Sequence, residues 1–352
     1  MEIKRSSGKL EWVEVGRGLA ALGVVLTHYS VTRTGEVTIP FFRSLGGYSV
    51  EFFFVLSGFI IFYAHGKEAG DPKAVAPYVW RRFVRVFPTY WMILGLAVLA
   101  TNFQPTLRNV DIGALRILRE SVLAPGSTLM IGQAWTLRHE VLFYAIFSLM
   151  LLNKRVGIVA FLAWMGAVAG NLAINGLPPG QVNDPLGILV HHYNLDFLLG
   201  MAIAIALRRE RTGLALAISV AIMLPPLVIW IASGYQDVTA KILFYKPLFA
   251  AVLIAAITAS RRGVAAPRML VKLGAASYAL YISHELTGSV SDAVLRHIPL
   301  GQIPVLTLRV AAAVIFAWGF HELIEAPVIE RLRHVPATWV RRRRERLAEA
   351  AA

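Results

Sequence analysis

The stretch Gly46 to His65 reads GGYSVEFFFVLSGFIIFYAH, and it decides the fold class. Apart from Glu51 and the terminal histidine, its residues are apolar, small or weakly polar. A helix rises about 1.5 Å per residue, so a stretch of this length crosses the roughly 30 Å of a bilayer's hydrocarbon layer. We therefore predict a transmembrane helix here, with Glu51 inside the membrane.

Similar apolar stretches recur along the chain. The 352 residues are 57% hydrophobic and 16% charged, whereas about a quarter are charged in an ordinary soluble domain. We predict an all-α polytopic membrane bundle in residues 1–335, with an amphipathic surface segment at 104–132 and a basic tail at 336–352. About ten spans are expected, at 15–34, 46–65, 83–102, 133–153, 156–174, 188–207, 213–232, 244–260, 272–294 and 303–327.

The charge pattern indicates how this bundle is oriented. The net charge of +14 would suit nucleic acid, but the basic residues cluster in short segments between the apolar stretches. Such clusters follow the positive-inside rule. We therefore expect a multi-pass inner-membrane protein with both termini cytoplasmic, the tail against anionic lipid, and no nucleic-acid partner. The absence of cysteine excludes disulfides, thiolate metal sites and a cysteine nucleophile.

Arg17 and His28 lie in the first predicted span. Because they are eleven residues apart, they share one helix face and are separated by about 16 Å. Ionisable side chains inside a membrane are costly and usually functional, although a lone histidine can also simply bridge two helices. We interpret His28 as a catalytic candidate.

Three further ionisable groups are predicted at the depth of His28, in the outer half of the membrane. They are Glu51, Glu140 and His284, from three different spans. Arg138 is close to Glu140 in sequence. The alternative is a buried polar network that only holds helices together, with Glu51 and Arg138 as partners.

A second polar layer is predicted at the cytoplasmic side. Arg82 and Arg85, at positions i and i+3, share one helix face, and arginine binds phosphate through two parallel hydrogen bonds. Arginines at a helix entry also arise from the positive-inside rule, and these two could pair with His321, Glu322 or Glu325. A coenzyme A thioester separates phosphates and acyl carbon by roughly 15–20 Å, close to the Arg17–His28 separation on one helix.

Together these segments resemble the acyltransferase 3 family of bacterial membrane O-acyltransferases. The resemblance covers nearly the whole chain. It is carried by six motifs in order: Arg17-x10-His28, the Phe-Phe-Phe-Val-Leu-Ser-Gly-Phe run after Glu51, Arg82-x-x-Arg85, Trp135-x-Leu-x-x-Glu140, Ser277-Tyr-x-Leu-Tyr with His284, and Glu325-x-Pro327.

The resemblance implies transfer of an acyl group, usually acetyl from cytoplasmic acetyl-CoA, to a hydroxyl of an O-antigen, exopolysaccharide or lipid-linked saccharide. It implies that His28 is essential and that the Arg82/Arg85 pair binds the donor. Acyl-CoA is then a substrate, and we expect no permanently bound cofactor and no metal. Many relatives read Ser-Val-Glu where this chain has Arg138-His139-Glu140.

On this reading His28 acts as a general base or as a transient acyl acceptor, and the sequence leaves both open. Arg17 is assigned to both the catalytic and the donor-binding set. We expect Glu140 to orient the imidazole, and Arg138 or a backbone amide to stabilise the oxyanion. The acyl group, acetyl or succinyl, and the oligomeric state leave no mark in the sequence.

Two other classes of function fit the intramembrane charges. A proton-coupled secondary transporter also uses buried acids and histidines, although we find no inverted repeat. A non-catalytic scaffold of a polysaccharide synthesis complex would need these charges only to hold its helices together.

Overall fold

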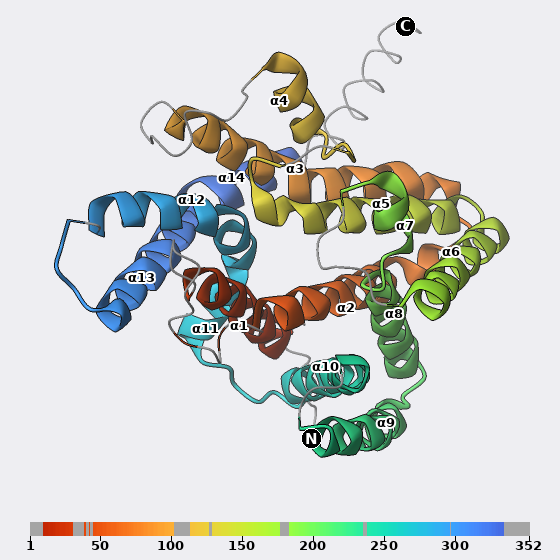
Figure 1. Ribbon diagram of the computed structural model, residues 1–352. Coiled ribbons are helices and arrows are strands. Elements are labelled where there is room, and N and C mark those ends of the chain that lie inside the picture. Colours follow the sequence, from red (N-terminus) through yellow and green to blue (C-terminus); the bar gives the residue numbers. More distant parts are fainter. Residues whose placement is uncertain are drawn as a thin grey trace, which may run out of the picture.

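The computed structural model confirms an all-helical membrane bundle (Figure 1). It describes residues 10–30, 39, 42, 45–101, 113–126, 129–176, 183–234, 238–295 and 297–333. No strand occurs in these ranges. The predicted basic tail, 336–352, lies outside them.

A helix is present at each of the ten predicted spans. Eight of the described helical segments are long and apolar enough to cross a membrane, while α1 and α12, which carry more polar side chains, fall outside that set. The helices in order are α1 Glu11–Tyr29, α2 Leu45–His65, α3 Val75–Ala100, α5 Trp135–Leu152, α6 Lys154–Asn175, α7 Pro185–Val190 with α8 Asn194–Arg208, α9 Thr212–Ala232, α10 Val238–Arg261, α11 Arg268–Ala275 with α12 Ser277–Leu295, and α13 Gln302–Phe320 with α14 Ala326–Arg333.

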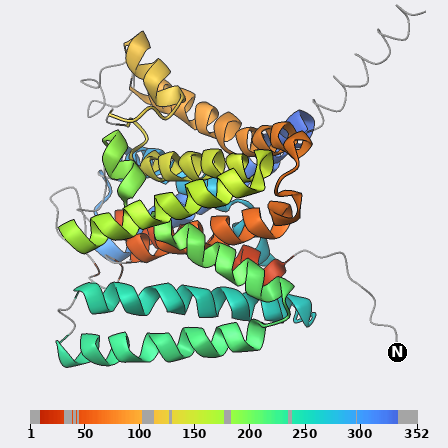
Figure 2. The same ribbon diagram turned by 90° about the vertical axis from the view of Figure 1, so that its right-hand side faces the viewer.

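The helices lie roughly parallel, in layers (Figure 2). α9 and α10 form the outermost layer, and α10 separates α9 from the rest of the bundle. Pro226 is the only fully buried residue of α9, and the other side chains of that apolar helix are exposed or half-buried. α3 begins and α14 ends at the same end of the bundle, on the right of Figure 2. We call this the arginine end, because the arginines of the predicted cytoplasmic layer are there.

One predicted span is interrupted. The expected single helix 188–207 is divided into α7 and α8 by residues 191–193. The Asn194 side chain donates to the carbonyls of Ile188 and Leu189, at 2.9 and 3.0 Å, and so satisfies groups that the break would leave unpaired. The predicted amphipathic segment is confirmed in part: it holds the short helix α4, Ala114–Ser121, on which Leu115 and Leu118 are exposed.

α2 and α8 pack with their backbones in close contact. A Cβ atom added at Gly200 would lie 1.9 Å from the carbonyl oxygen of Val55, and one added at Gly58 would lie 2.2 Å from that of Phe197. Only glycine fits at such positions, as in the small-residue interfaces of many membrane helices. This contact fixes α2, which carries Glu51 and lines the cavity described below.

Gly200→Ala is expected to lower the free energy of unfolding by about 1–3 kcal/mol, because the added methyl group must push α2 and α8 apart. Thermal unfolding in detergent measures the effect. Gly213→Ala is the matched control, since open space surrounds Gly213 on α9. Equal unfolding temperatures for the two variants would contradict the predicted packing.

Candidate active site

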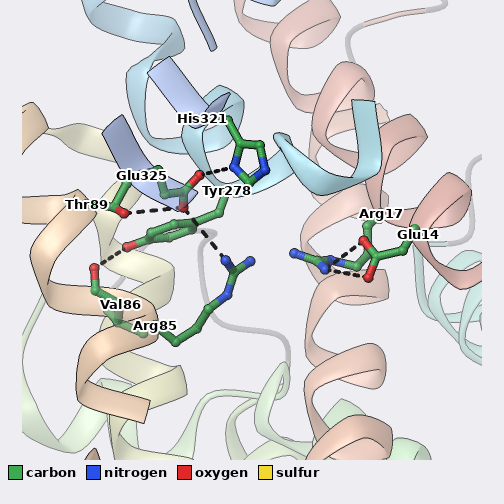
Figure 3. Close-up of polar contacts among 8 residues, drawn as sticks. All are labelled: Glu14, Arg17, Arg85, Val86, Thr89, Tyr278, His321 and Glu325. Atoms are coloured by element: carbon green, nitrogen blue, oxygen red, sulfur yellow. Dashed lines mark hydrogen bonds and ion pairs between the residues drawn. The ribbon is translucent and has the colours of Figure 1, made fainter. Parts of the chain in front are cut away.

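The arginine layer predicted from the sequence is present, and its residues come from α1, α3, α12 and the turn that follows α13 (Figure 3). Arg17 of α1 and Arg85 of α3 point toward one another. Arg17 is held by Glu14, one turn earlier, through Nη1–oxygen distances of 2.9 and 3.1 Å. Arg85 lies 3.7 Å from Glu325 and over the ring of Tyr278, 5.2 Å from its centroid. The two cations are therefore placed by neighbouring acids and an aromatic ring.

Glu325 anchors this layer from a distorted helix. His321–Glu325 forms a π-helical turn between α13 and α14, a distortion that often marks functional sites. The Glu325 carboxylate is fully buried, accepts from Thr89 Oγ1 at 3.3 Å and lies 2.7 Å from Nδ1 of His321. One alternative from the sequence was that Arg82 and Arg85 pair with the acids at the end of the last span. For Arg85 and Glu325 that pairing is observed, and of the two only Arg85 lines the cavity described next.

A cavity of about 510 Å³ extends from this layer into the bundle. Its lining on α2 runs from Val50 to Ile61, which is about 16 Å along the helix axis. The lining at the arginine end holds five arginines, and among the lining residues these face only two carboxylates. The arginines are Arg17, Arg81, Arg82, Arg85 and Arg333, and the carboxylates are Glu14 and Glu140.

The structure places Glu140 in the wall of this cavity. Its Oε1 accepts hydrogen bonds from Ser57 Oγ, at 2.9 Å, and from the hydroxyl of Tyr144. The Arg82 guanidinium lies over the Tyr144 ring, 5.8 Å from its centroid. Glu140 thus shares a cavity with the predicted donor-binding arginines.

His28 lies beyond the far end of the cavity and is not a lining residue. Its ring packs edge-on against His284, with 4.9 Å between centroids, and its Nδ1 lies 3.6 Å from Oε1 of Glu285. His284 in turn contacts Tyr281, which lines the cavity. The carboxylate beside His28 is therefore Glu285, and the expectation that Glu140 orients His28 is wrong in this arrangement.

Glu285 was not among the predicted site residues, although it directly follows His284 within a predicted span. The rule that intramembrane acids are functional candidates would have found it. His28, His284 and Glu285 bring potential ligand atoms within 4.8 Å of one another, a group that could hold a metal ion. The expectation that the protein binds no metal stays a prediction.

Arg138 and Glu51 face different surroundings, and each makes buried polar contacts of the kind that the alternative of a helix-pairing polar network expects. The Arg138 guanidinium donates to the carbonyls of Leu123 and Ala124, at 3.3 and 2.7 Å, and to Oδ1 of Asn183 at 2.9 Å. It therefore holds loop segments between the helices and does not reach the cavity, so it is not placed to stabilise an oxyanion there.

Glu51 belongs to a separate buried ion cluster. Lys246 Nζ lies 3.3 Å from Glu51 Oε2 and 2.6 Å from Oδ1 of the fully buried Asp196. A lysine between two carboxylates compensates charges that would be costly in this interior. Asp196 lies inside the predicted span 188–207 and could have been found by the same rule as Glu51, whereas Lys246 is only the third residue of the predicted span 244–260.

Comparison with known proteins agrees with this architecture. A family model described as an acyltransferase domain, that of the acyltransferase 3 family, matches residues 10–322. The chain is 26% identical over 303 residues to the "Exopolysaccharide production protein ExoZ" of Rhizobium meliloti (strain 1021), a match that covers 82% of this chain and 92% of the relative. No solved structure matches the chain. The family motifs supply several lining residues of the cavity, among them Arg17, Arg85 and Glu140, and this multi-pass membrane protein belongs to the acyltransferase 3 family.

Proposed function

We propose that this membrane acyltransferase moves an acyl group, acetyl in the first instance, from acyl-CoA to a hydroxyl of an exopolysaccharide or a related exported glycan. The observation that carries the proposal is the cavity, which leads from five arginines to the contact between Tyr281 and His284, next to His28. The printed name of the relative supports a glycan involved in exopolysaccharide production as the acceptor.

The arginine end suits the nucleotide part of the donor. Coenzyme A carries several phosphates, and arginines bind phosphate with strong, charge-assisted hydrogen bonds. Arg82 lines the cavity, and its Nε has no hydrogen-bond partner among the described residues. Phosphates would supply acceptors for that group, and they would neutralise the excess positive charge of the lining.

The length of the cavity suits the rest of the donor. With the phosphates at the arginine end, an extended pantetheine arm would lie along α2, whose lining covers about 16 Å. The thioester would then lie near Phe53 and Tyr281, whose rings contact each other with 5.8 Å between centroids. A shift of this pair would join the cavity to His28.

His28 would take the proton of the acceptor hydroxyl while the hydroxyl oxygen attacks the thioester carbonyl. The carbon–sulfur bond then breaks, and the protonated imidazole returns the proton to the departing thiolate. In the covalent alternative, the imidazole accepts the acyl group first and passes it to the hydroxyl. In both schemes one imidazole nitrogen must be unprotonated and directed toward the reactants.

The proposed location is the bacterial inner membrane, with the arginine end in the cytoplasm. The positive-inside rule supports this orientation, because α3 begins and α14 ends there with arginine-rich segments. Acyl-CoA is cytoplasmic and is consumed as a substrate, and no bound cofactor is needed for the reaction as written.

Mass spectrometry of surface and secreted glycans tests this function. Cells with the protein should carry an acyl mass increment that cells without it lack, and the size of the increment identifies the group. A strain with His28→Ala at normal protein levels should lack it as well. Identical glycans with and without the protein would contradict the proposed function.

A further inference from the structure

A carboxylate lies next to His28, and the proposed reaction does not yet give this carboxylate a role. His28 is near the end of α1, and Glu285 is on α12. Their closest approach, 3.6 Å between His28 Nδ1 and Glu285 Oε1, is slightly longer than a hydrogen bond. About 40% of each side chain is exposed, so both can adjust when a substrate arrives. Catalytic hydrogen bonds are often long without substrate and shorten in the reactive complex.

Neighbouring contacts hold the two helices in this register. The Tyr29 hydroxyl donates to the carbonyl of His284 at 2.5 Å and lies 3.0 Å from Thr287 Oγ1. Tyr29 follows His28 and His284 precedes Glu285, so this contact couples the two chain segments directly. The backbone positions of His28 and Glu285 are therefore set by a buried tyrosine and not by their own ion pair.

His284 forms the fixed wall behind His28. It is fully buried, and its Nδ1 lies 2.6 Å from the carbonyl oxygen of Tyr281. A carbonyl only accepts, so Nδ1 carries the proton, and Nε2 is an unprotonated nitrogen in the neutral ring. A neutral His284 ring cannot balance a positive charge that develops on His28, so another group must do so. Glu285 is the acid in reach.

The Glu285 carboxylate is itself held from its other side. The backbone amide of Gly132 donates a hydrogen bond to it, and a Cβ added at Gly132 would lie 3.0 Å from Oε2. Gly132 lies in the short turn directly before α5. This turn therefore anchors Glu285 on one side, while the carboxylate faces His28 of α1 on the other. This is the arrangement of a positioning group: a carboxylate anchored by a backbone amide and directed at one nitrogen of a histidine.

We propose that Glu285 is the positioning residue of His28. Its carboxylate accepts a hydrogen bond from the Nδ1–H group of the imidazole. The lone pair of Nε2 is then directed toward the acceptor hydroxyl. After Nε2 takes the hydroxyl proton, Glu285 remains ionised and stabilises the imidazolium until the proton passes to the thiolate of CoA. The same orientation serves the covalent alternative. This inference rests on the proposed function, but it concerns a different residue and helix.

The experiment uses the purified full-length protein in lipid nanodiscs, with radiolabelled acetyl-CoA as donor. The acceptor is glycan isolated from cells that lack the protein and freed of esters with alkali. Glu285→Gln should reduce kcat by about 10²–10⁴-fold, while the KM for acetyl-CoA stays unchanged, because the donor binds at the other end of the cavity. Glu285→Asp should restore part of kcat. The matched control, Glu210→Gln, changes an exposed acid between α8 and α9 that does not line the cavity, and it should retain wild-type rates.

The possible results separate this inference from the proposed function. A wild-type kcat in Glu285→Gln, with His28→Ala inactive, would overturn the role of Glu285 and leave the function intact. Loss of activity that Glu285→Asp does not restore, or that comes with a raised KM for acetyl-CoA or a lower unfolding temperature, would mark a structural role and also overturn it. Stoichiometric zinc in the wild-type protein that is lost in Glu285→Gln would assign the acid to a metal site instead. Activity in His28→Ala would refute the roles of both His28 and Glu285, whereas absence of acyl transfer by the wild-type protein would refute the proposed function itself.

Discussion

His28→Ala is expected to reduce kcat for acyl transfer by about a hundredfold or more, because no other described group beside Glu285 and His284 can replace a partly exposed imidazole. General acid–base catalysis contributes about 10²–10⁴-fold, and a covalent role would make the loss complete. The measurement is the rate of acetyl transfer from acetyl-CoA to alkali-treated glycan.

The His28 variant should fold normally. Its side chain is 40% exposed, and its polar and ring contacts with the described part of the chain are a long ion pair with Glu285 and an edge contact with His284. His297→Ala, at an exposed histidine after α12, is the control and should retain full activity. Undiminished transfer by a well-folded His28→Ala protein would exclude His28 from the chemistry.

Arg82→Ala is expected to raise the KM for acetyl-CoA by about 10–100-fold, since a hydrogen bond to a charged group contributes about 1.5–3 kcal/mol. The effect should depend on the phosphates. Acetyl-pantetheine has no phosphate. For this donor the wild-type and Arg82→Ala proteins should have the same KM, which should be much higher than the wild-type KM for acetyl-CoA. Comparing both donors with both proteins forms a double-mutant cycle, which isolates the contact between arginine and phosphate.

Arg155→Ala is the control for charge alone. Arg155 is exposed at the start of α6 and does not line the cavity. Its variant should keep the wild-type KM for acetyl-CoA. If Arg82→Ala raises the KM equally for both donors, the residue supports the shape of the cavity through Tyr144 and does not bind phosphate.

The cluster of Lys246, Glu51 and Asp196 shows why intramembrane charge alone is an ambiguous signal. Glu51 was predicted to lie at the same depth in the membrane as His28, and its position along α2 is compatible with that depth. Its partner is nevertheless Lys246 of α10, and none of the three is a lining residue of the cavity. Depth along a helix follows from sequence number, but the direction in which a side chain points depends on how the helix is rotated in the bundle.

The sequence by itself determined the helices and the residues worth testing. Apolar stretches of about 20 residues must be helical in a membrane, because only helices and closed barrels satisfy the backbone there. Ionisable groups are costly in that environment, which singled out Arg17, His28 and Glu140. Spacing of three residues also put Arg82 and Arg85 on one face. All of these follow from local periodicity and solvation.

Only the tertiary structure decided which of these groups meet. It put Glu285, not Glu140, beside His28, and turned Arg138 away from the cavity. Those neighbours depend on helix rotation and pairing, which are set by contacts such as Gly200 against Val55 and Tyr29 against His284. Such contacts join residues far apart in the chain, and helical periodicity carries no information about them.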